Sequence, residues 1–199
     1  MLINSADIIK SVRVEIPRKE EKTDGKAASV VVPSDGGVFV DDKSQSLTKA
    51  IGNIQPGTAT HYFSYGNFNL VRLILHLLRQ TGPAHIFMTS YSISIESIEQ
   101  IQRRIELEQI LSLRLIIDNR VKSLSPKPFQ MLSTIFNYRC SSVHAKIALI
   151  WNEHWNISVV TSQNATNNPK MERGIIFTEP RVFNFDLNAL ENEFDRAAT

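Results

Sequence analysis

The chain has 199 residues, of which 42% are hydrophobic and 21% are charged, and its formal net charge is +2. These proportions are ordinary for a soluble globular protein, and a chain of this length can bury a core without disulfides or a structural metal. The single cysteine, Cys140, cannot form an internal disulfide, and we expect it to be a buried, inert thiol. The most apolar run, residues 70–78, is too short and too charged to cross a bilayer, and the first residues lack an apolar stretch of signal-peptide length. We therefore expect a cytoplasmic protein with no membrane partner.

Residues 1–58 are predicted to form a small N-terminal β appendage. Residues 12–17 alternate in polarity like a short strand, and two apolar runs flank the turn-rich stretch Pro33–Gly37, which is typical of a hairpin. At about residue 59 the pattern changes to alternating helices and strands. We expect residues 59–199 to form the main domain.

The main domain is predicted to have the elements of an α/β protein with a mixed sheet. Helices are predicted over 68–80, from 98 to about 111, over 128–136 and over 183–194. Strands are predicted over 84–91, 113–118, 146–151, 156–162 and 174–178. In the first helix Arg72, His76 and Arg79 form a narrow polar stripe on an otherwise apolar element. The order of the elements implies a sheet covered by helices.

Charge is unevenly distributed along the chain. Residues 101–150 contain 8 basic and 3 acidic side chains, a net charge of +5, whereas residues 151–199 contain 4 and 7, a net charge of −3. The positive excess lies mostly upstream of His144. It is either a local field that attracts a phosphate-bearing substrate or a solvated basic surface, and the sequence favours neither.

Three groups of polar side chains lie near the ends of the last three predicted strands. His144 and Lys146 stand two residues apart at the start of one strand, so both side chains point to the same face. Ser162 and Asn164 have the same spacing at the end of the next strand. Glu172 lies just before the strand after that. On its own, a histidine at a strand end is more often structural than catalytic, so the prediction depends on the whole set.

These residue types suit phosphoryl transfer. Lysine supplies a compact positive charge to phosphate oxygens, and asparagine and serine donate further hydrogen bonds. Histidine can attack phosphorus covalently, and a carboxylate on its other nitrogen would fix the tautomer. No histidine or cysteine cluster has zinc spacing, so we expect neither a metal nor another cofactor.

The order HxK, Ser-x-Asn and glutamate resembles the signature, or HKD motif, of the phospholipase D superfamily. The resemblance is close over residues 141–178. It implies a sandwich of a mixed sheet flanked by helices. It also implies that His144 is the nucleophile that forms a phosphohistidine, that Lys146 and Asn164 bind phosphate oxygens, and that Ser162 assists them. Glu172, eight residues after Asn164, would orient the histidine.

Members of this superfamily use two such motifs, one histidine attacking phosphorus and the other protonating the leaving group. This chain has one motif, and none of its other four histidines lies in an HxK. The resemblance therefore implies a homodimer in which two copies of His144 meet across a two-fold axis. The expected activity is that of a metal-independent phosphodiesterase, a hydrolase of the nuclease type, with nucleic acid or another phosphodiester as substrate.

Two residues depart from the superfamily pattern. The aspartate expected five residues after the lysine is Trp151, and the glycine of the GSxN element is Thr161. These departures favour an alternative, a non-catalytic nucleic-acid or phosphate-binding module with a degenerate site, and a purely structural protein is a third possibility. Asn167 either binds substrate or only forms an Asn-Pro turn. Tyr91, at a strand end, either lines the pocket or belongs to the core or the rim.

Overall fold

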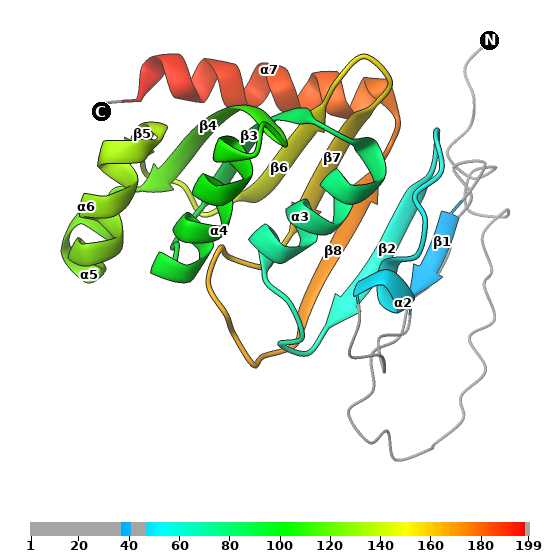
Figure 1. Cartoon of the computed structure of the whole chain (residues 1–199), viewed down its shortest axis with the longest axis horizontal. Coiled ribbons are helices and arrows are strands. Elements are labelled where there is room, and N and C mark those ends of the chain that lie inside the picture. The colour runs from blue at the N-terminus through cyan, green and yellow to red at the C-terminus, as the bar shows by residue number, and fades with distance from the viewer. Residues whose placement is uncertain (1–36, 41–46, 198–199) are drawn as a thin grey trace, which may run out of the picture.

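The computed structural model describes residues 37–40 and 47–197, which form one eight-stranded sheet with helices on both faces (Figure 1). The strands are β1 (Gly37–Val40), β2 (Ala59–Ser64), β3 (Ala84–Ser90), β4 (Ile110–Asp118), β5 (Asn137–Ser141), β6 (Lys146–Trp151), β7 (Asn156–Thr161) and β8 (Glu172–Phe177). The helices are α2 (Leu47–Ile51), α3 (Leu70–Thr81), α4 (Ile95–Glu106), α5 (Val121–Leu124), α6 (Pro126–Ile135) and α7 (Pro180–Arg196). The predicted mixed sheet flanked by helices is confirmed. None of the helices in these ranges is long and apolar enough to span a membrane.

The order of strands across the sheet is β1-β2-β8-β7-β6-β3-β4-β5. Strands β3, β4 and β5 are parallel, whereas β6 is antiparallel to both β3 and β7, and β8 is antiparallel to both β7 and β2. The carboxyl ends of β2, β3, β4 and β7 therefore meet the amino ends of β6 and β8. We call this side of the sheet the polar edge. In Figure 1 it is the lower edge, where the β7–β8 connection turns.

Each face of the sheet has its own core. Helices α3, α4 and α6 cover the larger core, and α7 covers a smaller one made of Phe87, Ile116, Leu149, Phe183, Leu190 and Phe194 (Figure 1). Side chains alternate along β6, so Ala148 and Ile150 enter the larger core while Leu149 enters the smaller. The same alternation places Lys146 on the face of α3 and α4. The sheet thus separates the histidine–lysine pair from α7.

The helices α3 and α4 both begin at the polar edge. Asn69 caps α3, its side-chain oxygen accepting a hydrogen bond from the Arg72 amide at 2.9 Å. Ser94 caps α4 in the same way, accepting from the Ser97 amide at 3.2 Å. Polar caps are favoured at these positions because they satisfy amide groups that have no partner within the helix. The positive ends of two helix dipoles consequently lie beside the candidate site.

Two strands of the sheet were not predicted. Strand β2 has the sequence ATHYFS and β5 the sequence NYRCS, and neither contains the apolar run by which strands are recognised. Pairing with neighbouring strands stabilises them instead, β2 with β8 and β5 with the end of β4. Most of the predicted hairpin around Pro33–Gly37 lies outside the described residues. Its described part, Gly37–Val40, is strand β1, which pairs with β2 in parallel.

Cys140 is buried in β5, as expected for an inert thiol. Burial raises the pKa of this thiol, although the nearby Lys122 ammonium acts in the opposite direction. A thiol held protonated in this way is a poor nucleophile.

Candidate functional site

His144 and Lys146 lie side by side at the start of β6. The Lys146 Nζ is 3.3 Å from both ring nitrogens of His144 and donates a hydrogen bond to the His144 carbonyl oxygen at 2.7 Å. Lys146 is only 6% exposed, whereas the His144 ring is open to solvent. The pair therefore combines a desolvated cation with an accessible imidazole.

The burial of Lys146 shapes the electrostatics of the pair. Desolvation lowers the pKa of the ammonium, and the carboxylates of Glu172 and Asp118 raise it in partial compensation. The Tyr91 ring centroid lies 5.9 Å from the same Nζ. A cation with so little hydration interacts strongly with an anion that enters the site.

Tyr91 and Arg120 form the rim next to His144. Tyr91 follows β3 directly, and its ring meets the His144 ring edge-on with centroids 5.5 Å apart. The Arg120 guanidinium lies over the same Tyr91 ring, 4.6 Å from its centroid. Its Nε donates to the buried Asp118 carboxylate at 2.8 Å. This contact holds the pKa of Asp118 below its ordinary value. The rim thus brings a second cation to the site.

Neither Asp118 nor Arg120 was predicted to belong to the site, because Asp118 was predicted only as the last residue of a strand and Arg120 only as part of the basic excess of residues 101–150. A signal was available, however. Residues 118–120 lie at the end of the predicted strand 113–118, which was expected in the same sheet as the predicted strand 84–91 that ends at Tyr91. If two such strands are parallel, as β3 and β4 are, their carboxyl ends meet at one edge.

Glu172 is held by two polar neighbours. Its carboxylate accepts hydrogen bonds from the Ser162 hydroxyl and from Asn168 Nδ2, the latter at 2.8 Å. The Ser162 oxygen also accepts from the Arg173 amide at 3.0 Å. Among the described residues no hydrogen bond joins Glu172 to His144, so within one chain the glutamate acts on the pair through its charge on Lys146.

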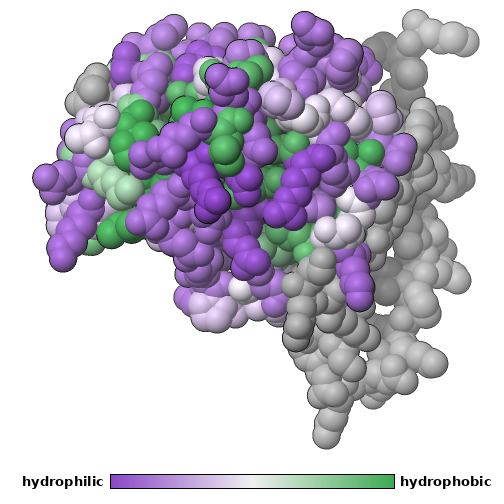
Figure 2. Space-filling view, viewed as in Figure 1, coloured by the Kyte–Doolittle hydropathy of each residue, from purple (hydrophilic) through white to green (hydrophobic). Residues whose placement is uncertain are grey.

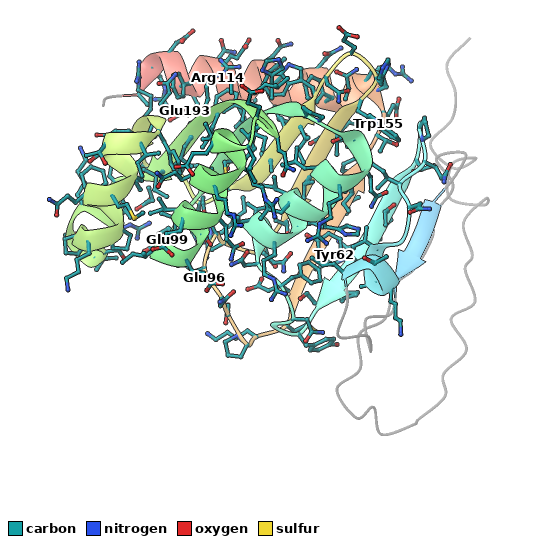
Figure 3. All side chains as sticks on the ribbon, in the orientation of Figure 1. Tyr62, Glu96, Glu99, Arg114, Trp155 and Glu193 are labelled. Atoms are coloured by element: carbon teal, nitrogen blue, oxygen red, sulfur yellow. The ribbon has the colours of Figure 1, made fainter. Side chains whose placement is uncertain are left out.

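Asn164 and Asn167 occupy different positions. The side-chain oxygen of Asn164 accepts from the Tyr91 amide at 3.2 Å, and within residues 47–197 its Nδ2 donor has no hydrogen-bond partner. Asn167 instead connects the two helix starts: it accepts from Asn69 Nδ2 at 3.0 Å and donates to Glu96 at 3.4 Å. Figure 3 shows Glu96 at the lower end of α4, at the polar edge. Asn164 therefore has a donor free for a ligand, whereas Asn167 fixes the β7–β8 connection.

Close packing against Gly66 also fixes this connection. Gly66 has a φ of +85°, and a Cβ placed there would lie 2.7 Å from the Pro169 Cα and 2.9 Å from the Asn168 carbonyl oxygen. A side chain at position 66 would have to displace the backbone next to Asn168, the residue that bonds Glu172.

The two departures from the superfamily pattern lie in different environments. Trp151 is at the far end of β6 and on the opposite face, its ring stacked on His85 at 5.4 Å and 5.8 Å from the Phe183 ring. Thr161 pairs with Lys146 across β6 and β7, and its hydroxyl interacts with Tyr62 at 3.0 Å and with the Arg173 carbonyl at 3.2 Å. Only Thr161 is next to the site. An aspartate in place of Trp151 would not reach it.

A metal centre would need clustered ligands. In the part of the chain that the structure describes, no group of three or more histidine, cysteine, aspartate or glutamate residues could hold a metal ion.

The architecture is the phospholipase D fold. Nuc from Salmonella typhimurium, a phospholipase D family member, matches with a TM-score of 0.54 and 12% identity over 70% of this chain and 96% of that one. NucT from Helicobacter pylori matches with a TM-score of 0.51 and 12% identity over 70% and 98%. The polyphosphate kinase from Porphyromonas gingivalis matches with a TM-score of 0.54 and 15% identity over 79% of this chain but 28% of its own. The predicted phospholipase D-like fold is confirmed.

No family model and no curated protein matches the sequence. At identities of 12–15%, these structural likenesses establish the fold alone, so the chemistry has to be inferred from the residues of the site.

Proposed function

We propose that this protein is a metal-independent phosphodiesterase in which His144 is the nucleophile. The observation that carries the proposal is the exposed His144 ring, 3.3 Å from the ammonium of the buried Lys146. The nucleophile and the cation that would neutralise a phosphate are thus already positioned for one another. Preorganised charge in a poorly solvated site contributes more to a transition state than the same charge in water.

The reaction proceeds in two displacements. A His144 ring nitrogen attacks phosphorus, a P–N bond forms, and the P–O bond to the leaving alcohol breaks as that alcohol takes a proton from an acid. Water then attacks the phosphohistidine and gives a proton to the base that the acid has become, the P–N bond breaks, and the second product, a phosphomonoester, leaves. Lys146 and the free Asn164 amide bind the non-bridging oxygens. Ser162 keeps the Glu172 carboxylate in place.

The acid of the first step is the His144 of a second copy of the chain. Each described chain provides one HxK pair at the polar edge, and the exposure of His144 leaves it accessible to a partner. A two-fold axis beside this edge would bring the two rings to one phosphate. Sedimentation equilibrium should therefore give a dimer, and a chain that stays monomeric at assay concentrations while turning over substrate would contradict this part of the proposal.

Nucleic acid is the proposed substrate class. Arg120 adds positive charge at the rim, and residues 101–150 carry a net charge of +5. A polymer of phosphodiesters is attracted by such a field and presents many scissile bonds to it.

The test is hydrolysis in EDTA of single-stranded DNA and of bis(p-nitrophenyl) phosphate, by the native chain and by His144→Ala. Native turnover that falls by about 10³-fold or more in the variant is the expected result. Exposed Arg181→Ala on α7 is the control and should retain full turnover. A native chain that cleaves neither substrate, or a variant as active as the native chain, would overturn the proposal.

One observation favours a second candidate, a phosphate-binding module without catalysis. Glu172 bonds Ser162 and Asn168, and among the described residues of one chain no carboxylate is hydrogen-bonded to His144. DNA binding that requires Lys146, with no cleavage by dimeric protein under any condition, would support this alternative.

A further inference from the structure

A groove separate from the histidine–lysine pair lies between α2, α3 and α4. It has a volume of about 580 Å³ and is lined by Leu47, Thr48, Arg72, Leu75, His76, Arg79, Gln100, Arg103, Arg104 and Leu107. A second hollow of about 420 Å³ shares Leu75, Arg79 and Arg104 with it, so the two are continuous. Figure 2 shows strongly hydrophilic side chains gathered over α3 and α4 on this face. Neither hollow is lined by His144 or Lys146.

Among the residues that the structure describes, four arginines and no carboxylate line this groove. Arg72 donates to the Asn67 carbonyl at 3.1 Å and Arg104 to the Gln109 side chain at 2.8 Å, both neutral partners. Within the described ranges none of the four arginines has a salt bridge; the four ion pairs there involve other residues. Four guanidinium groups around one hollow repel each other unless an anion lies between them.

The helix dipoles account for only part of this cluster. Arg79 is in the last turn of α3, and Arg103 and Arg104 are in the last turn of α4, where a cation is favourable. Arg72 is in the first turn of α3, where a cation is unfavourable, and that turn contains no acidic residue. The helix dipole therefore does not explain Arg72, whose side chain donates a hydrogen bond to the neutral Asn67 carbonyl.

His76 adds a buried donor to the same wall. Gln80 Oε1 accepts from the Ile54 amide and Gln80 Nε2 donates to the Gly52 carbonyl, both at 2.9 Å, which fixes the orientation of the amide. The same Nε2 lies 2.9 Å from His76 Nε2, so this ring nitrogen must be the acceptor. The proton of the neutral imidazole is then on Nδ1, and this atom is buried with no hydrogen-bond partner in the described part of the chain.

The ionisation of His76 agrees with this assignment. Burial lowers the pKa of the ring and the Arg79 charge lowers it further, against the Gly52 carbonyl, which raises it. The imidazole is therefore neutral at neutral pH, with one N–H donor that lacks an acceptor. A buried donor without a partner costs free energy, and this one belongs to a residue that lines the groove.

The groove leads away from the polar edge. Because β3 and β4 are parallel, α3 and α4 run in the same direction, with their starts at that edge and their last turns at the far end. Arg72 and Arg79 are seven residues apart, about 10 Å along the helix and on one side of it. The arginines thus extend from the polar-edge end of α3 to the opposite end of the helices, farther than a single phosphate can bridge.

We propose that the α3–α4 groove binds backbone phosphates of the nucleic-acid strand whose scissile phosphodiester lies at His144. The identity of the ligand as the substrate strand rests on the proposed function. The groove is then what distinguishes a polymer from a small diester: it adds affinity outside the reacting bond and takes no part in the chemistry.

The test measures binding separately from turnover. A labelled single-stranded oligonucleotide is titrated in EDTA with His144→Ala dimer and with the same chain carrying Arg79→Ala and Arg104→Ala. Binding should weaken about tenfold at low salt, and the slope of log K against log salt should become shallower by about 1.4 for two lost contacts to a single strand. Unchanged affinity and slope, or no oligonucleotide binding at all, would overturn the proposal.

The control removes two charges from the opposite side of the sheet. Arg181 and Arg196 lie on α7 and are largely exposed, so Arg181→Ala with Arg196→Ala changes the net charge equally. This pair should alter the slope far less than the groove pair. An equal loss in both would show a general charge effect and would contradict a groove.

A free nucleotide is the other source of the same phosphate chemistry. A 5′-mononucleotide that binds as tightly as the oligonucleotide, and loses affinity equally in the Arg79/Arg104 variant, would show a nucleotide site and overturn the assignment to a strand. In the chain with native His144, the groove variant should raise KM for DNA and leave turnover of bis(p-nitrophenyl) phosphate unchanged. If the native chain cleaves neither substrate, the proposed function fails while the binding result still decides the groove.

Discussion

The two ends of strand β6, which is six residues long, have opposite characters. At its amino end Lys146 is buried on the α3–α4 face, next to the exposed His144 ring. At its carboxyl end Trp151 lies on the α7 face between aromatic neighbours. Side chains an odd number of residues apart in one strand point to opposite faces of the sheet, so Lys146 and a residue at position 151 cannot contact each other. The amino end combines a buried charge with an exposed histidine, whereas the carboxyl end is packed among aromatic rings.

The largest expected effect is at the amino end. Lys146→Met keeps the length of the side chain and removes its charge, so we expect turnover to fall by about 10²–10³-fold. The free energy of unfolding should stay level or rise, because a desolvated cation is replaced by an apolar side chain. Urea denaturation and the EDTA assay measure the two quantities. A variant that keeps its activity, or one that loses both activity and fold, would break the comparison.

The opposite result is expected at the carboxyl end. Trp151→Ala removes contacts with His85 and Phe183 and should lower the free energy of unfolding by about 2–3 kcal/mol, less than for a fully buried tryptophan. Turnover per folded molecule should not change. Trp151→Asp, which recreates the superfamily's residue, should be destabilised in the same way and gain no activity. A rise in turnover would show that this end does communicate with the site.

The pH dependence sharpens the same comparison. Burial lowers the pKa of Lys146 from 10.5, so turnover should fall as pH rises through a value below 10.5. Between that lowered pKa and 10.5 the unfolded chain binds more protons, so the contribution of this group to stability rises with pH over the same window. Activity and stability should therefore change in opposite directions. Lys146→Met should lack the stability trend, and a parallel decline in both quantities would contradict the assignment to Lys146.

The smallest effect is expected at Asn168. Asn168→Ala removes one of the two hydrogen bonds to Glu172 and leaves the one from Ser162. A loss of about 1 kcal/mol in stability and a several-fold drop in turnover should follow. Turnover reduced as far as in Lys146→Met would mean that Glu172 has a direct catalytic part.

Local alternation accounts for only part of the amino end of β6. It applies to Lys146, the first residue of the strand, but His144 lies two residues before β6 begins, so the contact between the two side chains depends on the path of the chain that enters the strand. The same rule places Trp151 on the opposite face from Lys146. The replacement of the motif's aspartate by Trp151 is therefore weaker evidence for a non-catalytic protein than it was taken to be from the sequence. The spacing of Ser162 and Asn164 held less information, because β7 ends at Thr161 and the alternation ends with it.

The parts that were not predicted depend on pairing between distant segments. The addition of Asp118 and Arg120 to the site follows from the parallel register of β3 and β4, which no local pattern contains. Strand β2 is polar at His61 and Ser64 and becomes a strand through its pairing with β8. The partners of Glu172 depend on how the β7–β8 connection folds over Gly66, a close approach that a sequence does not reveal.

The hydrogen bond between Asn69 and Asn167 has a consequence for the order of folding. It joins residues 98 positions apart, and with it the start of α3 is tied to the connection that leads into Glu172. The βαβ units around β3 and β4 can form from near neighbours, whereas this closure brings together residues 98 positions apart and is slow for that reason. A chain still being synthesised therefore has the histidine–lysine pair before the Glu172 carboxylate is in place. In the proposed mechanism the ability to cleave would follow only after this closure and after the pairing of two complete chains.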